Sequence, residues 1–394
     1  MITPSTLDDA PDFSLVLGGP IYQWYRRTHL SGPVLELLHR RVLFFILLTW
    51  LPPFLLSIFS GHLLGNGELG FLRDIETQTK FLVAIPMLLI AELFVHKRIP
   101  LAVKRFIKQR IVTAEDLPRF HAAIESATRL RNSMPLELAL CLLVWTAGIW
   151  FWRNEIAQVA PTWYGFSDST GFHLRPAGYW NVLVSIPIVQ LLLLRWYLKL
   201  FVWFSFLWHV SRLNLNLWPS HPDRSGGLGF LGTSVYSFSL VLVAQGAIMC
   251  GTIANGVLDE GQNLMSYRLL ILTAVAFFVV VILGPLTMFT PHLTRAKRNG
   301  LAMYGNLATD YVMQFEHKWL GHGTTPGEVL GTGDIQSLAD LGNSYAVVRE
   351  MRFVPFGVQD ITRLVVTTAA PLLPLLLIVM PLEEMVMRVL KSIF

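Results

Sequence analysis

Long apolar runs, separated by polar segments rich in Lys and Arg, dominate the chain. A transmembrane helix needs about 20 mostly apolar residues, and seven runs approach that length. They lie near residues 42–60, 80–97, 136–152, 180–199, 234–254, 268–290 and 361–381. The pattern predicts an all-α protein, a polytopic integral membrane helix bundle with about seven transmembrane helices.

The positions of Lys and Arg orient this bundle, because cytoplasmic loops of membrane proteins carry an excess of both. With the N-terminus in the cytoplasm, 22 of the 31 Lys and Arg residues fall on the cytoplasmic side and 7 on the other, while Arg195 and Lys199 fall within the fourth run. We therefore expect a cytoplasmic N-terminus. Compact loops with this charge bias are typical of a multi-pass protein of the bacterial inner (cytoplasmic) membrane.

The segments around the apolar runs suggest three parts. Residues 1–41 are expected to form a cytoplasmic N-terminal segment with an amphipathic helix. Residues 42–381 form the seven-helix domain, with helical cytoplasmic loops at 98–135 and 291–360, and residues 382–394 form an interfacial tail. Pro100–Val112 alternates apolar and basic residues as an interfacial helix does. Whether Leu200–Val210 continues the fourth span is left open by the pattern.

Composition supports a membrane location and excludes several other classes of protein. The chain is 53% hydrophobic and 14% charged, whereas soluble domains carry about 25% charged residues. Its net charge of +5 is explained by topology, so no nucleic-acid partner is expected. Cys141 and Cys250 both lie in apolar runs and form no motif for a disulfide framework or a zinc site. We expect the lipid bilayer as partner, no metal and no cofactor.

Two ionisable residues stand out inside the apolar runs. Glu92 lies six residues after Pro86 and Arg195 eight residues after Pro187, which places the two at similar depths if the prolines are level. Charges in lipid are costly and usually find partners. The pair could therefore line an ion pathway, with Gln190 about one turn from Arg195. The alternative is that both side chains extend to the cytoplasmic head groups.

The fifth run carries a pattern of small and polar residues. Small residues recur every four positions, which allows close helix contact within one chain or between copies in a homo-oligomer; they are Gly246, Ala247, Cys250, Gly251 and Ala254. Gln245, Thr252 and Asn255 add polar groups. The run is thus a candidate either for lining a pore or for plain helix packing.

A third feature is the turn that begins at His221-Pro222-Asp223 and continues through Arg224, Gly226 and Gly227. Its backbone N–H groups could bind an anion beside Arg224, or His221 and Asp223 could contribute to a metal site. The alternative is a structural turn, since Pro, Asp and Gly all favour turns.

Three functions fit these features. A channel or other permeation protein for small ions or solutes, oligomeric or not, is favoured by the polar fifth run and the Glu92–Arg195 pair. A membrane scaffold, sensor or assembly factor is suggested by the helical cytoplasmic loops. A membrane enzyme acting on lipid head groups is less favoured, because no catalytic residues can be named from the motifs.

Overall fold

The computed structural model describes residues 13–29, 37–65, 68–151, 162–169, 171–321 and 333–379. The chain is 76% helical. Over the described residues, its strands are limited to one antiparallel pair, β1 (Gly165–Asp168) and β2 (Gly171–Leu174). The predicted all-α class is confirmed.

Six helical runs among the described residues are long and apolar enough to cross a membrane. They are Leu38–Phe59, Ile75–Lys108, Pro176–Val210, Gly229–Leu258, Leu264–Trp319 and Val358–Ile378. Each overlaps one of the predicted spans. Where the third span was expected, Met134–Gly148 forms a shorter apolar helix. The protein is therefore a multi-pass membrane protein, and the seventh crossing stays a prediction.

Most runs combine several helical elements. The first half of the chain contains α2 (Pro20–Arg27), α3 (Leu38–Thr49), α4 (Leu51–Phe59), α5 (Ile75–Gln78), the π-helix η1 (Thr79–Ala84), α6 (Ile85–Lys108), α7 (Leu117–Arg131), α8 (Met134–Leu143), the π-helix η2 (Val144–Gly148), α9 (Ile149–Phe151), α10 (Pro176–Trp180) and the π-helix η4 (Asn181–Ser185). The second half contains α11 (Ile186–Val210), α12 (Gly229–Ser234), the 3₁₀ helix η5 (Val235–Phe238), α13 (Ser239–Leu258), the 3₁₀ helix η6 (Leu264–Tyr267), α14 (Arg268–Leu283), the 3₁₀ helix η7 (Gly284–Phe289), α15 (Thr290–Trp319), α16 (Asp334–Arg349), α17 (Val358–Ala369), the 3₁₀ helix η8 (Ala370–Leu372) and α18 (Leu373–Val379).

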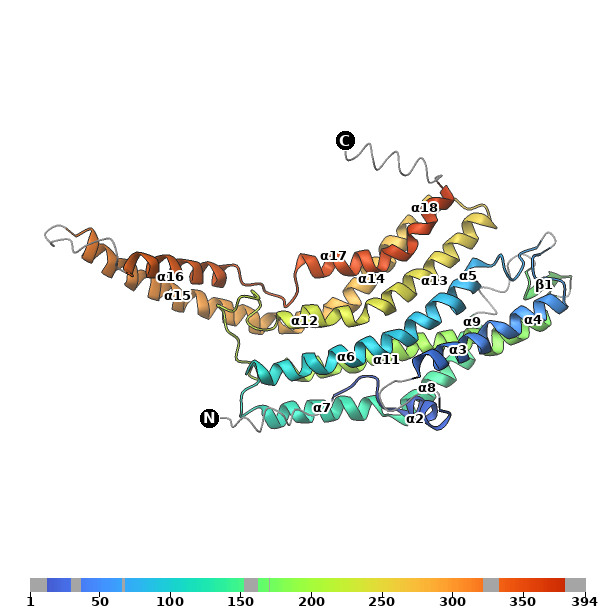
Figure 1. The fold of residues 1–394 in the computed structure, drawn as a ribbon, viewed down its shortest axis with the longest axis horizontal. Helices are drawn as coiled ribbons and strands as arrows, with labels where there is room; N and C mark the ends of the chain where they lie inside the picture. The colour runs from blue at the N-terminus through green and yellow to red at the C-terminus, as the bar shows by residue number, and fades with distance from the viewer. Residues whose placement is uncertain are drawn as a thin grey trace.

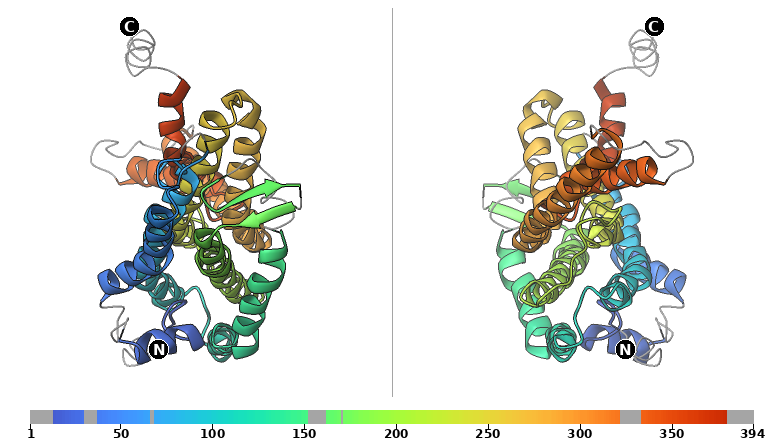
Figure 2. Two further views of the ribbon diagram at one scale, coloured as in Figure 1. Left: turned by 90° about the vertical axis from the view of Figure 1, so that its right-hand side faces the viewer. Right: turned by 90° about the vertical axis from the view of Figure 1, so that its left-hand side faces the viewer.

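The bundle has two distinct ends (Figure 1). At one end α15 and α16 extend together away from the other helices, and we call this the arm end. The β1–β2 pair lies at the opposite end, which we call the hairpin end. The end views in Figure 2 show α11, in green, between α3–α4 in blue and α8 in teal. Helix α11 therefore has neighbouring helices on two sides in these views.

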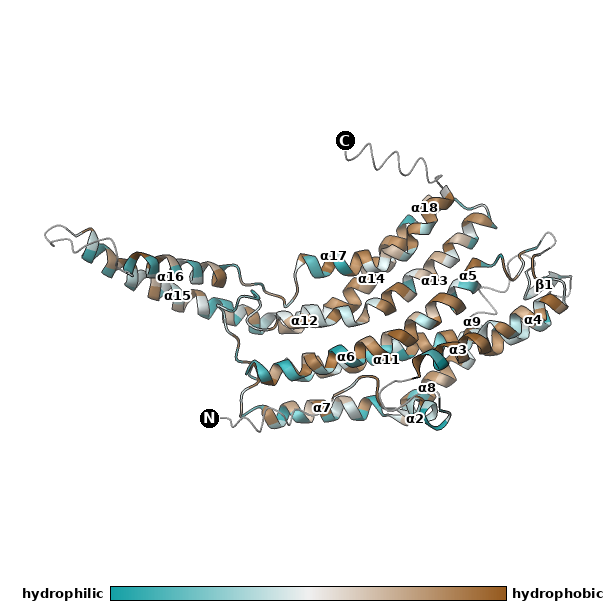
Figure 3. Cartoon of the chain, in the orientation of Figure 1, coloured by the Kyte–Doolittle hydropathy of each residue, from teal (hydrophilic) through white to brown (hydrophobic). Residues whose placement is uncertain are grey.

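Hydropathy differs between the bundle helices and the more peripheral helices. Figure 3 shows hydrophobic residues along the bundle helices and more hydrophilic residues on the arm, α2 and α7. Helix α14 exposes Leu269, Leu272 and Val280, each about two-thirds exposed. A helix that is apolar on all sides and stays exposed suits lipid contact.

Several predicted boundaries are corrected by the structure. Helix α3 begins at Leu38, so Arg41 belongs to the first apolar helix and not to the N-terminal segment. Helix α6 passes through Pro100 and ends at Lys108, so there is no separate interfacial helix at Pro100–Val112. The pattern left open whether Leu200–Val210 continues the fourth span, and the structure shows that helix α11 runs unbroken to Val210.

Tertiary packing explains why α6 continues past its proline. The Phe106 ring is fully buried and packs edge-on against Phe206 of α11 and Phe230 of α12. It also lies 5.8 Å from the ring of Phe120 in α7. These contacts stabilise the helical turn that follows Pro100 despite the hydrogen bond that proline removes.

The loop predicted at 291–360 consists mainly of the arm. Helix α15 continues directly from α14 through η7, and the two arm helices are joined by the ion pair between Lys318 and Asp334 at 2.5 Å. The predicted interfacial tail, 382–394, lies outside the described residues.

Candidate functional site

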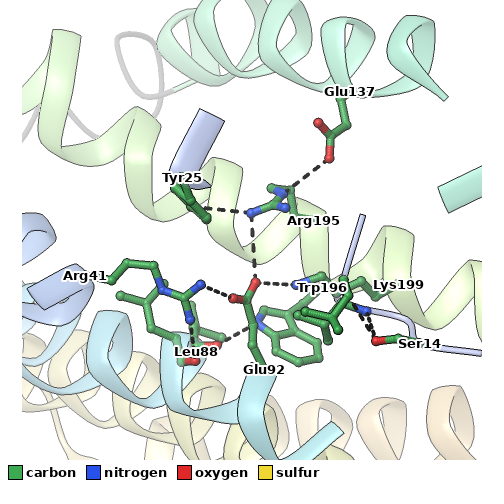
Figure 4. A network of polar contacts seen from close by, with 12 residues as sticks. Ser14, Tyr25, Arg41, Leu88, Glu92, Glu137, Arg195, Trp196 and Lys199 are labelled. Atoms are coloured by element: carbon green, nitrogen blue, oxygen red, sulfur yellow. Dashed lines mark hydrogen bonds and ion pairs between the residues drawn. The ribbon is translucent and has the colours of Figure 1, made fainter. Parts of the chain in front are cut away.

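A cluster of buried charges, which we call the inner network, lies where α3, α6, α8 and α11 meet (Figure 4). Glu92 of α6 is at its centre and is 3% exposed. Its carboxylate lies 2.9 Å from Arg41 Nη1 and 2.5 Å from Lys199 Nζ. One acidic side chain of α6 therefore ties together a cation from α3 and one from α11.

Arg195 of α11 links this centre to a second carboxylate. Its guanidinium lies 4.0 Å from Glu92 and 3.7 Å from Glu137 of α8. It also donates to the Tyr25 hydroxyl at 3.5 Å. All three contacts are long for hydrogen bonds. Arg195 is thus buried among acceptors that hold it only weakly.

Helical spacing brings the two α11 cations together. Arg195 and Lys199 are four residues apart, so both face α6 and α8. Trp196 lies between them in sequence and donates from its indole Nε1 to the Leu88 carbonyl at 3.1 Å. Lys199 Nζ lies 4.4 Å from the centre of the Trp196 ring. Helix α11 is therefore anchored on α6 at the level of the network.

The segment before α3 covers the arm-end side of the network. Phe13 stacks on Phe206 with ring centres 5.3 Å apart, and Arg131 donates to the Ser14 carbonyl. At the start of α2, the Ile21 N–H donates to Glu137 at 2.9 Å. Burial raises the pKa of the Tyr25 hydroxyl, which favours its neutral form. Residues 13–27 thus close the site with contacts from both ends of the segment.

A small cleft opens beside the network, under this covering segment. Three cationic side chains and one carboxylate line it: Arg131, Arg195, Lys199 and Glu137. Leu15, Gly18, Leu198 and Val202 complete the lining. The cleft connects the buried charges to the region between the N-terminal segment and α11.

The predicted pair of Glu92 and Arg195 is brought together, whereas Gln190 is not part of the network. The side-chain amide oxygen of Gln190 is packed against Gly148 and has no hydrogen-bond partner among the described residues. Arg41, Tyr25, Glu137 and Lys199 were missed. Two of them carry a sequence signal: Lys199 lies one turn after Arg195, and Glu137 is a carboxylate at the start of an apolar span.

The polar residues of α13 lie in separate places. Gln245 donates to the Tyr197 hydroxyl at 2.7 Å. Thr252 is exposed and bonds to the Ile248 carbonyl of its own helix. Asn255 belongs to the hairpin-end contacts described next. Among the described residues, these three side chains therefore do not line one common pore.

The small residues of α13 lie against neighbouring helices. A side chain at Gly246 would overlap the Thr368 carbonyl of α17, and one at Gly251 would overlap the Thr79 hydroxyl of η1. Ala247, Cys250 and Ala254 are all buried, and Cys250 and Ala254 pack with Leu372. The spacing of four residues therefore serves close contacts within this chain.

A second buried polar cluster, which we call the outer network, lies toward the hairpin end. The Asp74 carboxylate accepts from the Thr77 N–H at 3.0 Å and from the Thr77 hydroxyl at 2.6 Å. It also accepts from Trp163 Nε1 and from Asn255 Nδ2, both at 2.8 Å. The Asn255 carbonyl oxygen in turn accepts from the Ile75 N–H at 2.9 Å. These contacts tie the start of α5 to α13.

The turn at His221–Gly229 is closed by its own aspartate. The Asp223 carboxylate accepts from the N–H groups of Ser225, Gly227 and Gly229 at 2.8, 3.1 and 2.8 Å. His221 Nδ1 lies 2.9 Å from the same carboxylate. Three of the N–H groups considered for an external anion, those of Ser225, Gly227 and Gly229, are therefore occupied by Asp223.

The same turn holds the base of the arm. Arg224, Gly226 and Gly227 have positive φ angles of 55°, 62° and 96°. The Arg352 N–H donates to the Arg224 carbonyl at 2.7 Å, and the Arg224 side chain pairs with Glu350 at 3.1 Å. The turn thus has a structural role at the joint between bundle and arm.

No group of three or more His, Cys, Asp and Glu side chains in the described ranges is arranged to hold a metal ion.

Comparisons of the chain with protein-family models, with curated proteins and with solved structures find no match to any of them.

Proposed function

We propose that this protein conducts small ions across a bacterial inner membrane, along a pathway whose arm-end mouth is formed by the inner network. The observation that carries the proposal is the position of Arg195, which is 5% exposed and held only by long contacts inside an apolar bundle. Buried charges in membrane helices are costly and usually mark ion or substrate pathways. A purely structural bridge would favour shorter contacts.

The proposal includes a topology. We propose seven spans, with Met134–Gly148 and its continuation into α9 as the third, and with the arm end in the cytoplasm. The Lys and Arg distribution supports this orientation. The covering segment then closes the pathway from the cytoplasmic side. Assembly of several copies stays part of the proposal.

Current recording tests this function. Purified full-length protein is inserted into planar bilayers under a KCl gradient, as wild type and as Glu92→Gln. We expect discrete currents whose reversal potential shifts in Glu92→Gln. Glu125→Gln is the matched control, because Glu125 is exposed on α7 and loses the same charge. The currents and the reversal potential of this control should match those of the wild type.

Two results would count against permeation. One is the absence of current from folded, correctly inserted protein at all voltages. The other is equal loss of folded yield in Glu92→Gln and Arg195→Gln that a charge swap between the two positions restores, with unchanged currents. That result would make the inner network a structural bridge.

A second candidate function is a membrane scaffold or sensor, and the arm favours it. Helix α15 is 30 residues long and exposes Met303, Leu307 and Met313, each more than half exposed. An exposed helical arm with apolar side chains suits binding of a partner protein. A partner that co-purifies with the wild type and is lost from Met303→Lys/Leu307→Lys would favour this function.

A further inference from the structure

The cleft beside the inner network carries a more specific inference about the ion. It has room for about one water-sized particle. Arg131, Arg195 and Lys199 line it, and Glu137 is the carboxylate in the described lining. The lining is therefore mainly cationic.

The charges of the inner network do not balance. Among the described residues it contains three cations, Arg41, Arg195 and Lys199, and two carboxylates, Glu92 and Glu137. One positive charge is in excess, and Arg131 in the lining of the cleft adds to it. Because an uncompensated buried charge is costly, a bound anion would stabilise this arrangement.

Arg195 has hydrogen-bonding capacity to spare. A guanidinium offers five N–H donors, while the three polar contacts of Arg195 lie at 3.5, 3.7 and 4.0 Å. Lys199, by contrast, has a close contact with Glu92 at 2.5 Å, and Arg41, which lies 2.9 Å from Glu92, is not among the residues that line the cleft. The weakly held cation is one of those that face the cleft.

The neighbouring carboxylate is not free to move onto Arg195. One Glu137 oxygen accepts from the Ile21 N–H at 2.9 Å, and Gly19 packs closely against the other. The 3.7 Å separation from Arg195 therefore leaves the guanidinium available to an outside acceptor.

We propose that the cleft binds one small monovalent anion of the size of chloride, held by Arg195 and Lys199 with Arg131 at the entrance. The space beside the cations is about that of one small particle, and the apolar side chains of Leu198 and Val202 line it next to them. The inference rests on the proposed function for the role of the anion, as the permeating ion.

Calorimetric titration tests the site without any current. KCl is titrated into purified full-length protein in potassium gluconate at constant ionic strength. We expect saturable chloride binding by the wild type. Arg195→Gln should weaken binding by about tenfold or more, and Glu137→Gln should strengthen it several-fold because a like charge is removed beside the anion. Arg129→Gln, on the exposed face of α7, should bind as the wild type does.

The opposite signs of the two variants distinguish a site from general damage. Absence of saturable binding by folded wild type, or equal affinity in wild type and Glu137→Gln, would overturn the proposal. If Arg195→Gln does not fold, Lys199→Gln and Glu137→Gln decide. Currents without chloride binding would refute this inference alone, whereas chloride binding without currents would refute the proposed function alone.

Discussion

The inner and outer networks are both buried and polar, yet they are built differently. In the outer network, one carboxylate, Asp74, accepts hydrogen bonds at 2.6–3.0 Å from Thr77, Trp163 and Asn255. In the inner network, three cations share two carboxylates, and the contacts of Arg195 are 3.5 Å or longer. A fully satisfied network fixes the structure. A network with excess charge and long contacts can accept an ion, and this difference is why we place function at the inner one.

The largest effect on stability is expected from Glu92→Gln. Removal of the central carboxylate leaves the cations of three helices poorly compensated, which costs about 3–5 kcal/mol. Removal of this carboxylate should tighten chloride binding, because a negative charge near the anion is lost, and chloride should therefore stabilise the variant more than it stabilises the wild type. The loss relative to the wild type should then be smaller in chloride than in gluconate, by about 1.4 kcal/mol at saturation for a tenfold lower Kd. Thermal unfolding in detergent at both salts measures it, and equal stability in the two would contradict an anion site.

The same carboxylate-to-amide change in the outer network should act differently. Asp74→Asn places an amide NH₂ among donors and leaves buried groups unpaired, which costs about 3 kcal/mol. No excess charge arises there, so the loss should be the same in chloride and gluconate, and currents per folded molecule should be unchanged. A chloride-dependent loss in Asp74→Asn would show that the two networks do not differ as described.

Close packing beside the outer network predicts a moderate effect of Gly251→Ala. The new methyl group would overlap the Thr79 hydroxyl and crowd the Glu76 backbone, which costs about 1–3 kcal/mol. Gly342→Ala in α16 is the matched control, because nothing lies within 4 Å of its added methyl group. The control should be neutral or slightly stabilising. Equal unfolding temperatures for the two variants would argue against close contact of α13 with η1.

Tyr25 tests how the inner network is covered. The Tyr25 ring lies 5.3 Å from the Arg41 guanidinium carbon and 5.9 Å from that of Arg195. Tyr25→Phe keeps the ring and loses only a long hydrogen bond, so we expect a loss below about 1 kcal/mol. Tyr25→Ala removes the ring and should cost several times more. If both variants unfold at the same temperature, the ring contributes nothing to closure of the site.

The smallest effect is expected at the hairpin end, from an ion pair outside both networks. Arg175 donates to Glu68 at 2.8 Å and lowers the pKa of that carboxyl. The stabilisation is therefore fully present above the pKa of the unfolded chain, about 4.5, and is lost as the pH falls through the lower folded value. Glu68 is partly exposed, so the change should stay below about 1 kcal/mol. Unfolding between pH 3 and 6 should show it in the wild type and not in Glu68→Gln.

The sequence predicts the apolar helices of this fold better than their ends. Hydropathy locates the six long runs, but it places Arg41 outside α3 and ends α6 near Lys97. The burial of Phe106 between three other helices, which supports the turn after Pro100, depends on contacts with Phe120, Phe206 and Phe230. Such contacts between distant segments leave no local signal.

The candidate site is predictable only in part for the same reason. The rise per residue places Glu92 and Arg195 at similar depths, and the structure brings them to 4.0 Å. Arg41 lies at the start of another helix, where charged residues are common, so nothing in its local sequence distinguishes it, and the carboxylate of Glu137 at the start of an apolar span does not say which cation it meets. The cover formed by residues 13–27 depends on contacts such as Ile21 to Glu137, across 116 residues.

We propose that the inner network lies on an ion pathway and that the outer network does not. Planar-bilayer recording of wild type, Glu92→Gln and Asp74→Asn under one KCl gradient tests it most directly. We expect the reversal potential of Glu92→Gln to move toward the chloride equilibrium potential, because a carboxylate is lost from the pathway, while Asp74→Asn keeps the wild-type value. Identical reversal potentials in all three, or no current from folded and inserted wild-type protein, would contradict the claim.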